Sequence, residues 1–361
     1  MTNPLIISFL TLFYILITVL IIFYIERKLS SFIQDRMGPT ETGKYGSLQG
    51  IADLIKLLKK EDIVPEKSEK IYFKLAPVVI FLAVYVGFSF VPISPMRVAN
   101  QTPVGLFFML AIVSFDVVGL VMAGWSSGSK FSMLGAFRAI SQIISYEIPV
   151  GLSILSVVVL TGTLNLWDIA EMQAYPKENV NLFGLDFMGI NVSKVAGIFT
   201  WNILLYPILI PFFLIFFISS LAECNRAPFD IPEGESEIIG GFHTEYSGIR
   251  FGLFFLGEYA MMLLFCLLAV TLFLGGWASP LPNIGKFHLY DYTTGHSESL
   301  IGILKGFFWI YLKTLFLMTI QIWLRWTLPR LRIDQLMSLC WKYLVPISIL
   351  LLPIACVWNF F

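Results

Sequence analysis

Six carboxylates lie close together in one stretch of a chain that is otherwise apolar. The stretch runs from Ala222 to Gly248 and reads AECNRAPFDIPEGESEIIGGFHTEYSG. Carboxylates that are held near one another have raised pKa values and can exchange protons near neutral pH, which a proton relay requires. The alternative is an ordinary solvated loop, which composition alone permits. The six carboxylates belong to Glu223, Asp230, Glu233, Glu235, Glu237 and Glu245.

Composition identifies the solvent around the chain. Of its 361 residues, 57% are hydrophobic and 13% are charged, against about 25% charged in an ordinary soluble domain. Much of the surface must therefore face lipid. Eight apolar stretches approach the roughly 20 residues that a helix needs to cross a hydrocarbon core of about 30 Å. We predict an all-α integral membrane protein, with residues 1–361 forming a single polytopic domain of eight transmembrane helices. The expected spans are Pro4–Ile25, Ile71–Val91, Pro103–Trp125, Arg138–Leu164, Ala196–Ala222, Arg250–Gly276, Ile303–Trp326 and Trp341–Trp358.

Lysines and arginines gather in alternate connections between these spans. The first connection and every second one after it hold most of them. By the positive-inside rule these connections are cytoplasmic, which places both termini on the outer face and the acidic stretch on the cytoplasmic side. The first apolar run leads directly into Glu26-Arg27-Lys28 without a small-residue cleavage site, so we expect it to remain as a membrane helix. The connections on the opposite side hold Arg97, Lys177, Lys194 and Lys286.

The segment Ser47–Lys60 has the pattern of an amphipathic surface helix. Apolar side chains recur at helical spacing, while Asp53 and several lysines occupy the other face. Such a helix lies in the membrane interface with its apolar face down. From this segment alone, a membrane-surface anchor is the favoured interpretation. The apolar positions are Leu48, Ile51, Leu54, Ile55 and Leu58.

Four ionisable residues fall inside the expected spans. Counting about 1.5 Å per residue from each cytoplasmic end, Asp116, Glu147 and Glu258 all lie about 12–14 Å deep. Lys313 lies somewhat deeper, but its long stem can reach the same layer. A charge there costs roughly 2.5–3.5 kcal/mol on insertion scales, so the four should face one another or water. We predict a polar track for protons; static pairing, for instance of Lys313 with Glu258, is the alternative.

A polar stripe lies along the fourth expected span. Glu147, nine residues after Arg138, points about 180° away from that arginine on a helix with 3.6 residues per turn. The two side chains cannot neutralise each other within one straight helix. Glu147 therefore needs a partner from another element. The stripe itself consists of Arg138, Ser141, Gln142 and Ser145.

Several kinds of chemistry are excluded by what the sequence lacks. The four cysteines show no CxxC spacing and the three histidines fall in loops. We therefore expect neither an iron–sulfur or zinc site nor a haem held between membrane helices. No glycine-rich phosphate loop follows a strand pattern, so we expect no nucleotide site, and nucleic acid is not an expected partner. Whatever chemistry occurs, the chain itself is expected to carry no metal and no redox centre.

Four motifs, in order along the chain, resemble those of a known family. The first is ERK with DRMGPTETGKYGSLQGIADLIKLLKKEDIVP, and the second is RAISQIISYEIPVG in the fourth span. The third is AECNRAPFDIPEGESEIIGGFHTEYSGIRFGLFFLGEYA, and the last is KTLFLMTIQIWLRWTLPRLRIDQLMSLCWK. Over essentially its whole length the chain thus resembles the membrane subunit of bacterial respiratory complex I that adjoins the quinone site, the subunit 1 or H family of proton-pumping NADH:quinone oxidoreductases.

This resemblance implies a subunit that couples electron transfer to quinone with proton translocation. Ubiquinone or menaquinone would be the substrate, whereas flavin and iron–sulfur clusters would belong to partner subunits only. The partners implied are peripheral iron–sulfur subunits at the quinone site, small membrane subunits and antiporter-like subunits. The implied location is the bacterial inner (cytoplasmic) membrane, with both termini on the periplasmic side.

The resemblance also assigns roles to individual residues. In this family the cytoplasmic loops and the first span form the membrane-side wall of a quinone chamber, with the surface helix at its entrance. Positions matching the chamber and its coupling loop are Arg27, Arg36, Glu223, Arg226, Asp230, Glu233, Glu235 and Glu237. Positions matching the proton path are Glu147, Glu245 and Glu258, and the depth comparison alone adds Asp116 and Lys313. Positions matching a loop that packs against neighbouring subunits are Arg325, Arg330, Arg332 and Asp334.

Two other functions remain open from the sequence. One is a membrane subunit of an energy-converting hydrogenase, which keeps a similar scaffold and passes electrons to protons instead of quinone. The ERK motif and the long surface helix speak against it. The other is a stand-alone ion antiporter or channel, for which the buried charges alone would suffice.

Overall fold

The structure is a computed structural model that describes residues 4–96, 102–176, 195–232, 234–283 and 288–358. Of Pro4, Leu5, Glu235 and Ser236 it describes only the backbone. Within these ranges the chain forms helices and connecting loops, without strands. The all-α fold class is therefore confirmed.

Seven helical segments of the described chain are long and apolar enough to cross a membrane. Each overlaps one of the expected spans, although several extend beyond the expected bounds. They are α1 (Pro4–Ile33), α3 (Lys70–Gly87), α4 (Gly105–Val113) with α5 (Phe115–Ser126), α6 (Lys130–Thr161), α12 (Gly248–Leu272), α14 (Leu300–Thr327), and α15 (Ile333–Ser338) with η6 (Leu339–Leu344) and α16 (Val345–Trp358).

The remaining expected span, Ala196–Ala222, is broken into η4 (Gly197–Thr200), α9 (Asn202–Leu205) and α10 (Leu209–Glu223). Pro207 follows α9, and the residue before a proline is driven out of the helical region, as the extended backbone of Tyr206 shows. The 15 residues of α10 cover roughly 22 Å at a rise of about 1.5 Å per residue. The count of eight continuous transmembrane helices is thus not met, because proline divides this one.

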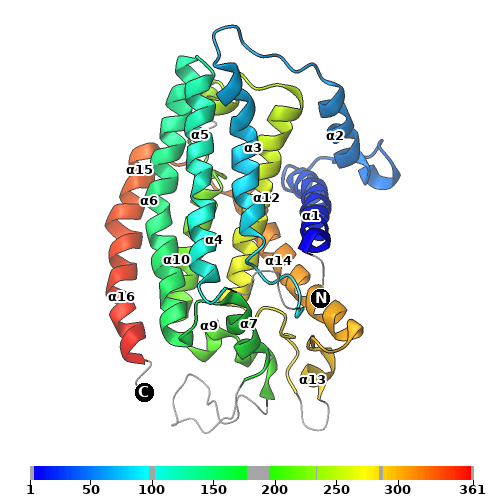
Figure 1. Ribbon diagram of the computed structural model, residues 1–361, viewed down its shortest axis with the longest axis vertical. Helices are drawn as coiled ribbons and strands as arrows, with labels where there is room; N and C mark the ends of the chain where they lie inside the picture. The colour runs from blue at the N-terminus through cyan, green and yellow to red at the C-terminus, as the bar shows by residue number, and fades with distance from the viewer. Residues whose placement is uncertain (1–3, 97–101, 177–194, 233, 284–287, 359–361) are drawn as a thin grey trace.

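The long helices stand side by side along the longest axis of the molecule (Figure 1). In this view α3, α5, α6 and α12 run nearly parallel, and α16 packs along α6. α1 is seen almost end-on, so it crosses these helices steeply. The short helices α7 (Leu166–Ala174) and α13 (Leu289–Thr293) lie at the end of the bundle where the C-terminus also lies.

α12 is the central helix of the bundle. It packs against α1, α3, α10 and α14, and every residue from Tyr259 to Leu272 is buried. A helix that is apolar on all sides belongs in such a position, since lipid or protein must surround it completely. Glu258 immediately precedes this buried run. It therefore lies at the edge of the most tightly packed part of α12.

The predicted surface helix is confirmed as α2 (Gln49–Lys59), which has no buried residue. It lies to one side of the bundle in Figure 1 and contacts α1 and α12. Arg27 of α1 holds it through an ion pair with Asp53, with Nη2 and Oδ2 2.7 Å apart. Its apolar side chains, including Ile51 and Leu58, are exposed, as expected of a helix that lies on a membrane.

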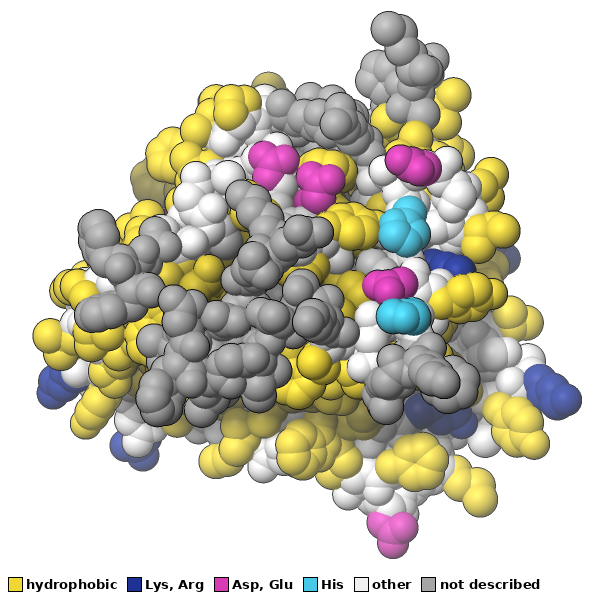
Figure 2. Space-filling model, turned by 90° about the horizontal axis from the view of Figure 1, so that it is seen from below, with side chains coloured by type: hydrophobic (Ala, Val, Ile, Leu, Met, Phe, Trp, Pro, Cys, Tyr) yellow, Lys and Arg dark blue, Asp and Glu magenta, His cyan; other side chains and the backbone are white. Residues whose placement is uncertain are grey.

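The end of the bundle near α7 and α13 displays acidic and histidine side chains. Figure 2 shows this face, on which Asp, Glu and His side chains are visible together with a few lysines and arginines. The four basic residues expected on this side, Arg97, Lys177, Lys194 and Lys286, lie outside the described residues. The predicted topology therefore stays a prediction.

Two glycines hold the acidic loop against α6. Gly241 begins the short helix η5 (Gly241–His243) with φ +58°, a conformation that favours glycine. A Cβ added to Gly135 of α6 would lie 2.5 Å from the Gly241 Cα, so the two backbones come this close only because Gly135 has no side chain. A Cβ added to Gly241 would lie 1.9 Å from the carbonyl oxygen of Pro232. The loop between α10 and α12 is thereby fixed to the bundle.

Gly135→Ala should loosen this contact. We expect faster protease cleavage of the loop in the full-length protein in native membranes, because the added methyl group forces η5 away from α6. Gly151→Ala is the matched control on the same helix, since an added Cβ there meets nothing within 4 Å. Equal cleavage rates for both variants would contradict the proposed glycine contact.

Candidate functional site

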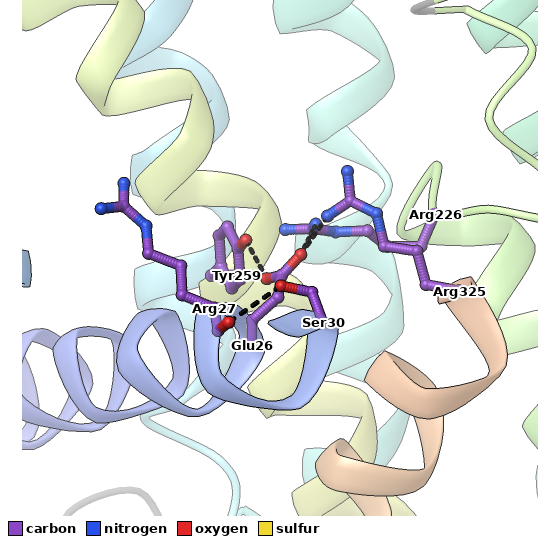
Figure 3. Close-up of polar contacts among 6 residues, drawn as sticks. All are labelled: Glu26, Arg27, Ser30, Arg226, Tyr259 and Arg325. Atoms are coloured by element: carbon purple, nitrogen blue, oxygen red, sulfur yellow. Dashed lines mark hydrogen bonds and ion pairs between the residues drawn. The ribbon is translucent and has the colours of Figure 1, made fainter. Parts of the chain in front are cut away.

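A buried carboxylate near the C-terminal end of α1 joins three helices and a loop (Figure 3). Glu26 accepts hydrogen bonds from Tyr259 of α12 and from Arg325 of α14. Arg226, in the loop after α10, places Nη1 3.7 Å from Glu26 Oε1. One negative charge thus faces two positive charges in a site that is nearly closed to solvent.

Arg226 is held as a permanent cation. Its guanidinium lies over the ring of Tyr259, 3.9 Å from the ring centroid. Burial by itself lowers the pKa of Arg226, but the nearby Tyr259, Glu26 and Glu258 outweigh it and hold the pKa above the ordinary arginine value. Arg226 therefore stays positively charged at any physiological pH.

The acids predicted to share one depth do meet. Asp116 of α5, Glu223 of α10 and Glu258 of α12 line a single small cavity of about 20 Å³, which gives room for about one water molecule. Asn225 and Cys224 complete its polar side. The depth comparison thus placed Asp116 and Glu258 correctly, and the end of α10 adds Glu223 to the same layer.

Glu147 joins this layer from α6. Its carboxylate contacts the hydroxyl of Ser114, at the break between α4 and α5. Glu147 and Asp116 both lie near enough to Glu223 for their charges to interact. The prediction that Glu147 finds its partner on another element is therefore confirmed. Arg138 instead pairs with Glu237 of the acidic loop, with Nη1 and Oε2 2.8 Å apart.

His243 connects the layer to the acidic loop. Its Nε2 lies 3.1 Å from Glu258 Oε1, and the ring stacks on Phe255 and meets the edge of Phe254. These rings fix the imidazole in one orientation. A protonatable side chain of the loop is thus in direct contact with a carboxylate of the buried layer.

The acidic loop is held to the helices beneath it by polar contacts. Gln142 of the predicted polar stripe is buried, and its Nε2 donates to the carbonyls of Ala222 and Phe229 at 2.7 and 2.8 Å. Arg330 donates to the carbonyl of Ile231 at 3.1 Å. Because a buried amide strongly prefers to keep its hydrogen bonds, Gln142 fixes the course of the chain after α10.

The other predicted residues of this loop differ in exposure, and two of them are not fully described. Asp230 and Glu245 are half-buried, and Glu237 is exposed. Glu233 lies outside the described residues, and so does the side chain of Glu235, although its backbone begins α11 (Glu235–Ile238). The expected roles of Glu233 and Glu235 stay predictions.

Lys313 does not reach the acid layer. Its ammonium donates to the carbonyls of Leu274, Gly276 and Ala278 at 2.7, 3.0 and 2.7 Å. These carbonyls follow the far end of α12, roughly 21 Å along that helix from Glu258 at about 1.5 Å per residue. All three N–H groups are used on backbone, so Lys313 fastens α14 to the turn after α12. The expectation that its long stem reaches the acid layer is wrong, and the alternative of a static pair with Glu258 is not met either.

The residues expected at the edges of the site are exposed. Arg36 lies on the surface after α1, and Arg332 and Asp334 lie on the surface at the start of α15. Arg27 is engaged with α2 as described above. Their exposure is compatible with contacts to neighbouring chains, which stay predictions.

Sequence reasoning missed Glu26, Ser114, Tyr259 and His243 as members of the site. The first expected span ended at Ile25, whereas α1 continues to Ile33, so Glu26 was counted as a flanking charge. A search for buried acids that extended one turn beyond each expected span would have found it. Ser114 and Tyr259 carry no formal charge and offered no comparable signal.

The described residues contain no group of three or more His, Cys, Asp or Glu side chains that could hold a metal ion. All four cysteines are free thiols. The side chains that the structure brings together, a chain of carboxylates, one imidazole and fixed cations on several helices, are suited to protonation chemistry.

Glu26→Gln should destabilise the protein strongly, because Arg226 and Arg325 lose the charge that compensates them. Removing one partner of a buried ion pair typically costs about 3–5 kcal/mol. Arg27→Gln is the control, since it breaks the partly exposed pair with Asp53, for which about 1 kcal/mol or less is expected. Thermal unfolding of the purified protein measures the difference, and equal shifts in both variants would contradict the importance of the Glu26 cluster.

Comparisons with known proteins agree with these features. A family model described as NADH dehydrogenase matches residues 6–356. The chain is 52% identical over 349 residues to an H-type subunit of NADH-quinone oxidoreductase from Cytophaga hutchinsonii, covering 95% of this chain and 96% of that protein. It is 45% identical to the H-type subunit from Chlorobaculum parvum over 335 residues, covering 93% of this chain and 86% of that protein. With the H-type subunit from Bacteroides fragilis it shares 43% identity over 341 residues, covering 94% and 86%. The chain therefore belongs to the NADH dehydrogenase family of multi-pass membrane proteins, which includes these H-type subunits of NADH-quinone oxidoreductase.

Proposed function

We propose that this protein is the membrane subunit of a proton-translocating NADH:quinone oxidoreductase that borders the quinone and carries the first part of the proton path. The observation that supports this most directly is the layer of Asp116, Glu147, Glu223 and Glu258 on four different helices, of which two are buried and two half-buried. Buried acids are costly in a membrane protein and mark ion or proton pathways. The names of the relatives supply the electron-transfer reaction to which such a layer would be coupled.

The Glu26 cluster forms the end of this layer nearest the surface helix. Glu258 acts electrostatically on Arg226, and Arg226 in turn faces Glu26. The charged groups are therefore continuous from the acids of α5 and α6 to the cytoplasmic end of α1. Arg27 holds α2 beside this end, where the resemblance expects the entrance of the quinone chamber.

The proposed coupling begins with the charge that appears on the quinone. Two electrons from an iron–sulfur cluster of a partner subunit and two protons convert the quinone to quinol. Charge that develops near Arg226 and Arg325 changes the field at Glu26 and Glu258, because electrostatic interactions are strong where water is excluded. Protons then redistribute along Glu258, Glu223, Asp116 and Glu147.

The exposed surfaces of the protein suggest where other subunits of the complex would bind. The exposed Arg332 and Asp334, together with the acidic loop, would contact peripheral and membrane subunits of the complex. α2 would lie on the cytoplasmic surface of the bacterial inner membrane, with both termini on the periplasmic side, as the positive-inside rule predicts.

Glu147→Gln and Glu223→Gln should each reduce proton pumping by roughly tenfold or more in the assembled complex, since an amide cannot carry the proton that general relay chemistry requires. NADH:quinone reductase activity and the pumped protons are measured together in membrane vesicles. Glu66→Gln is the control, because Glu66 is an exposed acid on the cytoplasmic side. If reductase activity and pumping both stay at the parent level, the changed residue has no part in the path.

Purification of the tagged chain under mild detergent separates this proposal from its alternatives. We expect iron–sulfur subunits to copurify, with quinone reductase activity that quinone-site inhibitors abolish. A stand-alone antiporter would purify without them. A hydrogenase subunit would retain iron–sulfur partners but release hydrogen and resist those inhibitors.

A further inference from the structure

Ser114 faces Glu147 from the break between α4 and α5. Its Oγ contacts Glu147 Oε1 and also lies 3.0 Å from the carbonyl oxygen of Leu110, one turn earlier. A hydroxyl has a single proton to donate and two lone pairs that accept. Ser114 therefore cannot donate to both oxygens at once.

The Leu110 carbonyl does not depend on the hydroxyl. It already accepts the backbone N–H of Ser114 at 3.0 Å, so the Oγ proton is free to turn away from it. When Glu147 is ionised, Ser114 donates to the carboxylate. When Glu147 is protonated, the carboxyl donates to Oγ, and the serine proton returns to Leu110. Both protonation states keep a hydrogen bond between Ser114 Oγ and Glu147 Oε1, with no movement of the backbone.

The groups that surround Glu147 make this contact important. Glu223 on α10 presents a carboxylate near enough to interact with the charges of both Glu147 and Asp116. Among the described residues no lysine or arginine forms an ion pair with Glu147, whereas Arg138 on the same helix pairs with Glu237. The donor within reach of the Glu147 carboxylate is thus the neutral hydroxyl of Ser114.

We propose that Ser114 is a positioning residue for Glu147, and that its hydroxyl reverses the direction of their hydrogen bond each time Glu147 gains or releases a proton. The contact keeps the carboxyl group in one place in both states, so the proton can pass without rearrangement of α6. This inference rests on the proposed function for its purpose, but the hydrogen bond can be tested separately.

The variants are Ser114→Ala, which removes the hydroxyl, and Ser114→Thr, which keeps it. Ser156→Ala is the matched control, because Ser156 is a buried serine of α6 whose Oγ donates at 2.7 Å to a carbonyl of its own helix. The assembled complex is purified in each case. Infrared difference spectra between acidic and alkaline buffer detect the carbonyl band of protonated carboxyl groups, and the band missing in Glu147→Gln is assigned to Glu147.

We expect the Glu147 band to change frequency in Ser114→Ala and to remain near its parent frequency in Ser114→Thr and Ser156→Ala. Proton pumping should fall roughly tenfold in Ser114→Ala, the factor expected when one hydrogen bond to a charged group is lost, and should recover in Ser114→Thr. An unchanged band in Ser114→Ala, or no band lost in Glu147→Gln, overturns the proposed contact.

A changed band with unchanged pumping in Ser114→Ala overturns the positioning role. If pumping also stays unchanged in Glu147→Gln, the proton-path function of Glu147 fails as well. The spectra and the pumping assay thus distinguish a failed contact from a failed function.

Discussion

The burial of Glu26 between two arginines and a tyrosine is the constraint on which the arrangement of the site depends. Taking an ion out of water costs several kcal/mol, which only close opposite charges and hydrogen bonds offset. Glu26 receives these from α12, α14 and the loop after α10. Each of those elements must therefore stay where it is for the charge to be tolerated. The C-terminal end of α1, which crosses the bundle steeply, is fixed by electrostatics as well as by packing.

The acid layer is built differently from that cluster. Asp116, Glu223 and Glu258 border a small cavity. Carboxylates gathered in this way repel one another when ionised, so their protonation depends on one another. A site of this kind responds as a unit to a new charge nearby. Arg226 lies between the two arrangements and, as a permanent cation, transmits the field without itself titrating.

Much of this was accessible from the sequence, and what was missed has identifiable causes. Hydrophobic length located the membrane helices, and a constant rise per residue placed Asp116 and Glu258 in one layer. The same count failed for Lys313, because depth alone does not tell which backbone carbonyls are in reach. Pro207 was visible, but an apolar run was expected to continue through it. Glu26 was missed because α1 extends eight residues beyond Ile25, to Ile33, and charge at a span end usually marks the membrane surface.

Lys313 and Glu147 show how a buried ionisable group can be recognised as fixed or exchangeable. The ammonium of Lys313 has three carbonyl acceptors, one for each N–H, and loss of a proton would leave one of them unpaired. Glu147 instead meets a hydroxyl that can accept as readily as it donates. Both are ionisable residues inside expected membrane spans, and that fact does not separate them. The chemistry of the partner does, because a proton moves easily only where both of its states are satisfied.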